Sequence, residues 1–115
     1  MNFKNIPSFD KQCKKLSKKY YSIDSDLEQF KKIIKKFPKG SGQHSHILKQ
    51  KKGIFIIKSR FSCRTTKSKN FRIIYAYHEN LNEIKIIEFI EIYAKNQKEN
   101  HDFALVDAYF KATFF

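Results

Sequence analysis

Two stripes of apolar residues with helical spacing lie in the first third of the chain. One runs over residues 9–20 and the other over residues 23–37, and within each the apolar positions recur every three or four residues. Because that interval puts side chains on one face of a helix, both segments are predicted to be amphipathic helices, and Pro38 ends the second. The link between them is so short that the helices should form an antiparallel hairpin. The stripes consist of Phe9, Cys13, Leu16, Tyr20, Ile23, Leu27, Phe30, Ile34 and Phe37.

After Gly53 the chain becomes rich in residues that favour β-strands. Residues 54–61, 71–77 and 84–93 form three such runs, separated by polar turns. The third run is apolar on both faces, which predicts a central strand covered by helices. Asp102 can cap a short helix over residues 103–111. These elements predict an α+β fold in a single domain, residues 1–115.

Composition narrows the class of protein. A hydrophobic content of 41% with twelve phenylalanines and six tyrosines is sufficient for a packed core. No apolar run approaches the roughly 20 residues that span a bilayer, and the first residues lack the apolar segment of a signal peptide, so a cytoplasmic protein is expected. Cys13 and Cys63 show neither a CxxC motif nor Cys/His ligand spacing, so no zinc site is expected.

Basic residues are concentrated in the middle of the chain. Residues 29–78 hold fourteen lysines and arginines and no acidic residue, while the net charge of the whole chain is +13. A field of one sign attracts a polyanion, and nucleic acid is the commonest such partner. The alternative is a solvated lysine-rich surface. The basic residues are Lys31, Lys32, Lys35, Lys36, Lys39, Lys49, Lys51, Lys52, Lys58, Arg60, Arg64, Lys67, Lys69 and Arg72.

Three of these cations are predicted to meet on the sheet. Alternation along the first predicted strand puts Lys58 and Arg60 on one face. If this strand pairs with the next around the turn between them, Arg72 comes near Arg60. Rigid strands would then present several cations to one phosphate. The alternative is that Arg72 pairs with Glu88 or Glu91 on the third strand.

Two motifs give the chain a family resemblance. Residues 71–77 read FRIIYAY, and residues 87–102 read IEFIEIYAKNQKENHD. Preceded by a helical hairpin and a Lys/Arg-bearing strand, these motifs resemble the RelE/ParE superfamily of bacterial toxin–antitoxin toxins over residues 9–102. The resemblance implies an N-terminal helical hairpin packed on a small twisted antiparallel sheet, with a short C-terminal helix. It also implies one of two functions, because RelE-like members cleave messenger RNA, often on the ribosome, whereas ParE-like members inhibit DNA gyrase.

For a RelE-like member the resemblance implies a ribonuclease that uses no metal and no cofactor. The RNA 2′-hydroxyl attacks the adjacent phosphate and leaves a 2′,3′-cyclic phosphate and a 5′-hydroxyl. By the family pattern, Arg72 holds the phosphate while Lys58 and Arg60 stabilise its charge. The candidate RNA-binding residues are Lys49, Lys51, Lys52, Arg64, Lys67, Lys69, Lys95 and Lys98.

The general base departs from the family pattern. RelE-like enzymes place a tyrosine a few residues beyond the last basic positions, where this chain has His101. Histidine is a sound base because its pKa lies near neutrality. The alternative is a surface histidine that merely precedes the helix cap at Asp102. His44 and His46, which precede the basic strand, are further candidates for the base.

Tyr93 is assigned to the core. Strict alternation along the third predicted strand groups it with Ile87 and Phe89, although Glu91 shares that face.

Three functions therefore stay open. The first is a ribonuclease that acts on messenger RNA and is held by a cognate antitoxin through an acidic or amphipathic segment. The second is a gyrase inhibitor or a catalytically inactive relative, favoured by the absent tyrosine. The third is a nucleic-acid-binding module without activity, which needs only the charge. None of the three requires a membrane.

Overall fold

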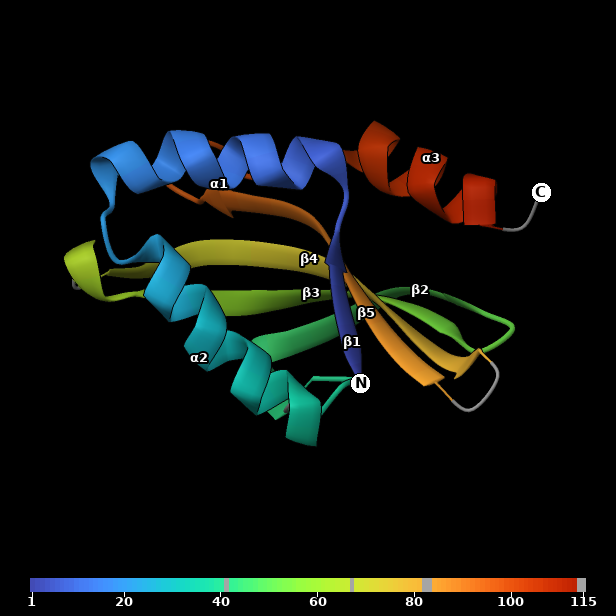
Figure 1. Cartoon of the computed structure of the whole chain (residues 1–115). Helices are drawn as coiled ribbons and strands as arrows, with labels where there is room; N and C mark the ends of the chain where they lie inside the picture. Colours follow the sequence, from blue (N-terminus) through green and yellow to red (C-terminus); the bar gives the residue numbers. More distant parts are fainter. Residues whose placement is uncertain (41, 67, 82–83, 114–115) are drawn as a thin grey trace.

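The computed structural model is a five-stranded sheet with helices on both faces (Figure 1). Helices α1 (Pro7–Lys19) and α2 (Ile23–Lys36) cover one face, called here the hairpin face. Helix α3 (Phe103–Thr113) covers part of the other, the C-terminal face. The predicted α+β class is confirmed. The described residues are 1–40, 42–66, 68–81 and 84–113.

The sheet is mixed, with the strand order β1-β5-β4-β3-β2. Strands β2 to β5 pair antiparallel, whereas β1 runs parallel to β5. The prediction of a purely antiparallel sheet that follows the helices is wrong, because β1 precedes the helices and pairs parallel. The strands are β1 (Asn2–Asn5), β2 (Ser45–Lys51), β3 (Ile54–Cys63), β4 (Ser68–Leu81) and β5 (Ile84–Ala94).

The two edge strands are the ones that the sequence analysis does not predict. β1 is four residues long and contains a single apolar residue, Phe3, whose ring stacks on Phe89 with centroids 6.2 Å apart. β2 is largely polar, since only Ile47 and Leu48 are apolar among its seven residues. An edge strand needs little apolar surface, so both segments lack the pattern by which strands are recognised.

The helices begin and end close to where the apolar stripes predict. α1 and α2 diverge from the link after residue 19 as a V (Figure 1), and α2 ends just before Phe37 and Pro38. Asp102 caps α3 as predicted, because its carboxylate accepts the backbone N–H of Leu105 at 3.0 Å. No helix among the described residues is long and apolar enough to cross a membrane.

An aromatic core fills the space between the hairpin and the sheet. Phe30 of α2 packs edge-on against Phe61 and Tyr75, with ring centroids 5.7 and 6.0 Å apart. Phe9 of α1 stacks on Phe89 at 5.3 Å. Burial of such large rings is the main favourable term in the stability of a small domain.

The C-terminal face is divided into two halves. α3 covers one half, where Val106 packs against Ile56, Ile74, Ala76 and Ile90. The other half lies beyond the helix and carries charged side chains. This division positions the candidate site.

A β-bulge in β5 changes which side chains reach the C-terminal face. Ile74 pairs with Glu91 and Tyr75 with Phe89, so Ile90 is an extra residue in β5. Beyond the bulge the alternation is shifted by one residue. Tyr93 therefore lies with Glu91 on the C-terminal face, and its predicted place beside Phe89 in the core is wrong.

Candidate functional site

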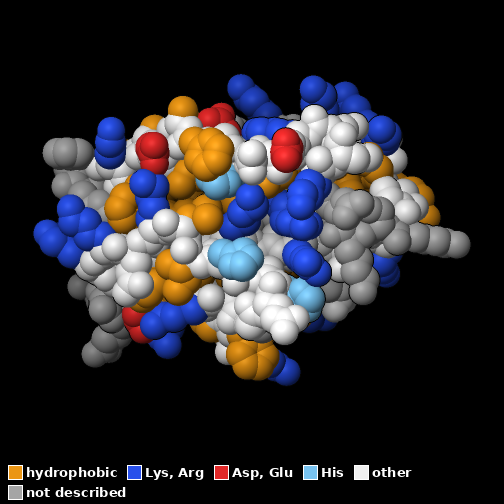
Figure 2. Space-filling view, turned by 180° about the vertical axis from the view of Figure 1, so that it is seen from behind, with side chains coloured by type: hydrophobic (Ala, Val, Ile, Leu, Met, Phe, Trp, Pro, Cys, Tyr) orange, Lys and Arg blue, Asp and Glu red, His pale blue; other side chains and the backbone are white. Residues whose placement is uncertain are grey.

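The uncovered half of the C-terminal face holds a cleft of about 400 Å³. In Figure 2, basic side chains and histidines gather at the middle of this face. Four cations line the cleft and, among the described residues that form it, no carboxylate does. We call it the cationic cleft. Its lining residues are Gln43, His44, His46, Leu48, Lys58, Ser59, Arg60, Arg72 and Lys95.

Strand pairing holds three of the cations together. Arg60 of β3 lies directly opposite Arg72 of β4, and Lys58 is two residues along the same face of β3. This confirms the predicted approach of Arg72 to Arg60. The Arg72 guanidinium also donates to the backbone carbonyl of Phe71 at 3.0 Å. Because the backbones belong to paired strands, the cations are held at fixed spacing.

His101 reaches the same cluster from the segment that follows β5. Its Nδ1 lies 3.4 Å from Nζ of Lys58, and its ring lies against Phe103 with centroids 4.3 Å apart. Only 8% of His101 is exposed, so the alternative of a surface histidine is wrong. With Lys58 as an ammonium donor, Nδ1 is the acceptor and the ring proton is on Nε2.

Burial and like charge disfavour protons on this pair. Burial lowers the pKa of Lys58, and the neighbouring Arg72 lowers it further, while Glu91 partly opposes both. Burial also lowers the pKa of His101, with Lys58 as the next cause. His101 is therefore neutral at pH 7, and in this form its Nδ1 can accept a hydrogen bond from the Lys58 ammonium.

Glu91 is a fully buried carboxylate beneath the cluster, with 0% exposure. It accepts the Lys98 ammonium at 2.5 Å and the backbone N–H of Asp102 at 2.8 Å. These two contacts tie the segment after β5 to the sheet on either side of His101. Glu91 thus positions His101 without touching the cleft.

Tyr93 lies opposite Arg72 in the strand register. Its ring is 5.9 Å from Nζ of Lys58 and 5.6 Å from Nζ of Lys98. Its hydroxyl is buried and has no hydrogen-bond partner among the described residues. Burial raises the pKa of Tyr93, with Glu91 as the next cause, so the hydroxyl keeps its proton and can act as a donor. Sequence reasoning missed Tyr93 because the bulge is not visible in the apolar pattern.

Arg64 lies outside the cleft. Its Nε donates to Asp26 at 2.7 Å, and its backbone N–H donates to the same carboxylate at 3.0 Å. Burial alone would raise the pKa of Asp26, but hydrogen bonds from Ser22 and Arg64 together lower it. Arg64 therefore joins β3 to α2.

The remaining candidate residues are scattered. Lys95 lines the cleft, whereas Lys98 pairs with Glu91 beside it. Lys49 forms an ion pair with Asp107 of α3 at 2.8 Å. Lys51 and Lys52 lie at the turn between β2 and β3. Lys67 and the side chain of Lys69 lie outside the described residues.

The two candidate histidines before β3 do reach the cleft. His44 and His46 both line it, and both are exposed. They differ from His101 in this exposure, because only 8% of His101 is exposed.

The described residues contain no candidate metal site, and the chain matches no known protein in the comparisons below. Within the described ranges, no group of three or more His, Cys, Asp or Glu side chains could hold a metal ion, and both cysteines are free and buried. Burial raises the pKa of Cys13 to about 12. Comparison with protein-family models, with curated proteins and with solved structures finds no match.

Proposed function

We propose that this protein is a metal-free endoribonuclease that cleaves messenger RNA, in the manner of the RelE-like toxins that it resembles. One observation carries the proposal. Paired strands hold Lys58, Arg60 and Arg72 around one cleft, and a buried neutral histidine contacts Lys58. A nuclease of this kind needs cations around the phosphate and a base for the 2′-hydroxyl.

The cations supply the electrostatic part of the reaction. Arg72 and Arg60 hold the non-bridging oxygens of the scissile phosphate, and Lys58 stabilises the charge that builds up as the phosphorus gains a fifth ligand. The fixed strand backbones support this role, because little reorganisation is then needed as the charge develops.

The Lys58–His101 pair supplies the base. The bond between the 2′-oxygen and phosphorus forms while the bond to the 5′-oxygen breaks. Lys58 in its neutral amine form accepts the proton of the 2′-hydroxyl, and the ammonium that results donates to Nδ1 of His101. Burial, followed by the neighbouring Arg72, lowers the pKa of Lys58 and so favours the amine form. Solvent at the open side of the cleft returns a proton to the 5′-oxygen. The products are a 2′,3′-cyclic phosphate and a 5′-hydroxyl.

The proposal includes partners. Messenger RNA, engaged on the ribosome, is the substrate, and the site of action is the cytoplasm. A cognate antitoxin would hold the protein inactive through an acidic or amphipathic segment placed over the cationic cleft. The net charge of +13 favours a negatively charged partner.

The test is brief induction in a bacterial host followed by mapping of messenger RNA 5′ ends. We expect new cleavages in translated messages, reduced about 100-fold or more by Arg72→Ala, since removal of one preorganised donor typically has that effect. Lys14→Ala, an exposed change on α1, is the matched control and should leave cleavage unchanged. Intact RNA together with growth arrest would instead indicate gyrase, and intact RNA with normal growth a module that only binds.

A further inference from the structure

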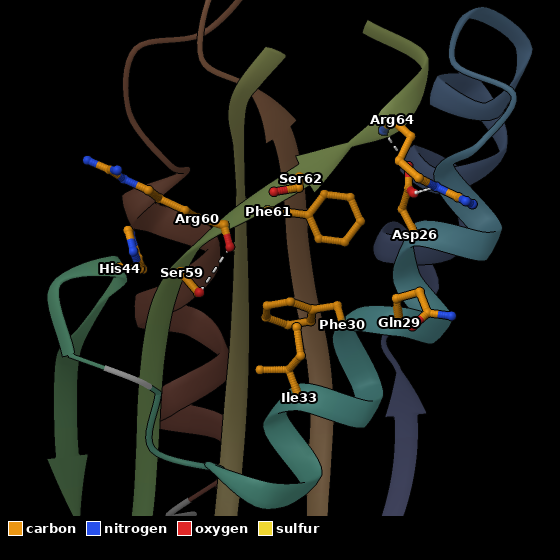
Figure 3. Close-up of a pocket in the computed structure, with 10 residues that line it drawn as sticks. All are labelled: Asp26, Gln29, Phe30, Ile33, His44, Ser59, Arg60, Phe61, Ser62 and Arg64. Atoms are coloured by element: carbon orange, nitrogen blue, oxygen red, sulfur yellow. Dashed lines mark hydrogen bonds and ion pairs between the residues drawn. The ribbon is translucent and has the colours of Figure 1, made fainter. Parts of the chain in front are cut away.

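A second hollow, of about 470 Å³, lies between α2 and β3 (Figure 3). Phe30 and Ile33 of α2 form one wall, and Phe61 and Ser62 of β3 form the other. His44 lines one end of the hollow and Arg64 the other (Figure 3). We call it the α2–β3 pocket. Ile33 is 53% exposed although it is apolar, so this wall offers apolar surface to a ligand.

An open strand edge borders the pocket. β2 pairs with β3 only as far as Ser59, opposite Ser45. Beyond it, residues 60–63 of β3 have no strand partner on that side within the described part of the chain. In this stretch the Arg60 carbonyl accepts the Ser59 hydroxyl at 3.0 Å and the Cys63 carbonyl accepts the Thr66 hydroxyl at 3.3 Å. Other backbone groups on the open side can meet a ligand in the pocket.

The length of this edge limits what it can receive. One end of this open stretch lies at the turn that contains His44. The other end lies at Arg64, which forms an ion pair with Asp26. Four residues are at the short end for a strand pairing and match the length of β1. A compact heterocycle fits this space better than an added peptide strand does.

The charge of the pocket favours a ligand that carries phosphate. Asp26 is the single carboxylate among its described lining residues, and Ser22 and Arg64 already occupy that carboxylate. His44, Ser59 and Arg60 line both this pocket and the cationic cleft, so the two hollows adjoin one another at β3. A ligand whose phosphate lies in the cleft can therefore extend into the pocket.

We infer that the α2–β3 pocket binds one base of an RNA strand whose phosphate lies in the cationic cleft; the inference rests on the proposed function and gives it a source of sequence preference. The apolar side chains of Phe30 and Ile33 contact the plane of the base. The backbone of β3 at residues 60–63 and the Ser62 hydroxyl form hydrogen bonds with the polar atoms along the rim of the base. Recognition of a splayed single-stranded base by stacking and edge contacts is the usual mode for RNA.

The first test measures binding, and does not depend on cleavage. Protein with labelled isoleucine methyl groups is titrated with the 3′-monophosphates of adenosine, guanosine, cytidine and uridine, and separately with inorganic phosphate. We expect a saturable shift of the Ile33 methyl signals with at least one nucleotide and none with phosphate. Ile33→Trp fills the pocket from an exposed position, and should weaken nucleotide binding by roughly tenfold, the scale of one base stack. Phosphate binding should not change.

Lys36→Trp is the matched control, because it adds the same ring to an exposed position of α2 outside the pocket. It should leave nucleotide affinity unchanged. A second readout comes from the mapped RNA ends, where Ile33→Trp should relax the base preference at one position beside the cut while cleavage continues.

The outcomes separate this inference from the proposed function. Cleavage that depends on Arg72, with no response of Ile33 to any nucleotide, would overturn the base site and leave the ribonuclease standing. A response of Ile33 to nucleotides without any cleavage would support the base site in a protein that only binds RNA. If the Ile33 signals respond to an acidic peptide and not to nucleotides, the pocket is a peptide site and the inference is wrong.

Discussion

The hairpin face and the C-terminal face of the sheet bury different kinds of side chain. Under α1 and α2 the core is apolar, and the buried polar groups beside it have partners. Ser22 donates to Asp26 at 2.7 Å, and the Tyr75 hydroxyl donates to the Pro38 carbonyl at 2.9 Å. The C-terminal face instead buries Glu91 and His101, together with a Tyr93 hydroxyl that has no partner among the described residues. Buried polar groups cost stability unless they are satisfied. We therefore attribute most of the folding stability to the hairpin face and the proposed catalytic groups to the C-terminal face.

Removal of a ring from the hairpin face should have the largest effect. Phe89→Ala deletes a fully buried ring that stacks on Phe3 and Phe9. We expect a loss of about 3–5 kcal/mol in the free energy of unfolding, measured by urea denaturation. Phe103→Ala is the comparison on the other face, where the ring is exposed. It should cost far less, and an equal loss would contradict the assignment of stability to the hairpin face.

Loss of the Glu91 charge should affect both stability and the site. Glu91→Gln removes the ion pair with Lys98 but keeps an acceptor for Asp102, so we expect a loss of about 1–3 kcal/mol. The Glu91 charge raises the pKa of His101, so its removal should lower that pKa further. Titration of the His101 ring by NMR checks the direction. Glu99→Gln, at an exposed position, is the control, and an unchanged His101 titration in Glu91→Gln would show that Glu91 does not act on the histidine.

Two tyrosines provide the sharpest contrast between the faces. Tyr75→Phe removes a satisfied hydroxyl and should cost about 1 kcal/mol of stability. Tyr93→Phe removes a buried hydroxyl without a partner among the described residues, so stability should stay constant or rise. If RNA supplies the missing partner, Tyr93→Phe should at the same time reduce cleavage. Thermal denaturation and RNA cleavage are measured together, and a destabilised Tyr93→Phe protein would contradict the description of that hydroxyl.

The smallest expected effect is a dependence of stability on pH. Burial lowers the pKa of both His78 and His101 in the folded protein below the ordinary value of 6.5. The unfolded chain therefore binds protons first as the pH falls, so stability should decrease from pH 7 downward through 6.5 toward the folded pKa values. His78→Gln should make this slope shallower in denaturation curves at several pH values, and an unchanged slope would contradict a lowered pKa of His78 in the folded protein.

Local patterns predicted part of this arrangement. The apolar stripes and Pro38 defined α1 and α2, and alternation placed Lys58 and Arg60 on one face, with Arg72 opposite Arg60. Each of these features depends on residues near one another in sequence or on a single turn.

Features that depend on distant contacts were not predictable in the same way. The mixed sheet requires β1 to pair with β5, which the polar sequence of β1 does not signal. Arg64 is a predicted RNA contact, and its ion pair with the buried Asp26 carboxylate of α2 could not be foreseen from the sequence. The bulge at Ile90 places Tyr93 beside Lys58, and the apolar pattern of β5 contains no break that would reveal it.

The parallel pairing of β1 with β5 has a consequence for synthesis. Asn2 pairs with Ile86, so β1 leaves the ribosome long before its partner strand exists. Until β5 is made, β4 has β3 as its partner on one side but no strand on the other, and Glu91 and Tyr93 are also missing. A nascent chain therefore cannot close the sheet or assemble the cluster around Lys58 until β5 and the segment up to His101 have been made. Because Lys95 of the cleft follows β5, the finished cleft can form only after that strand has been made.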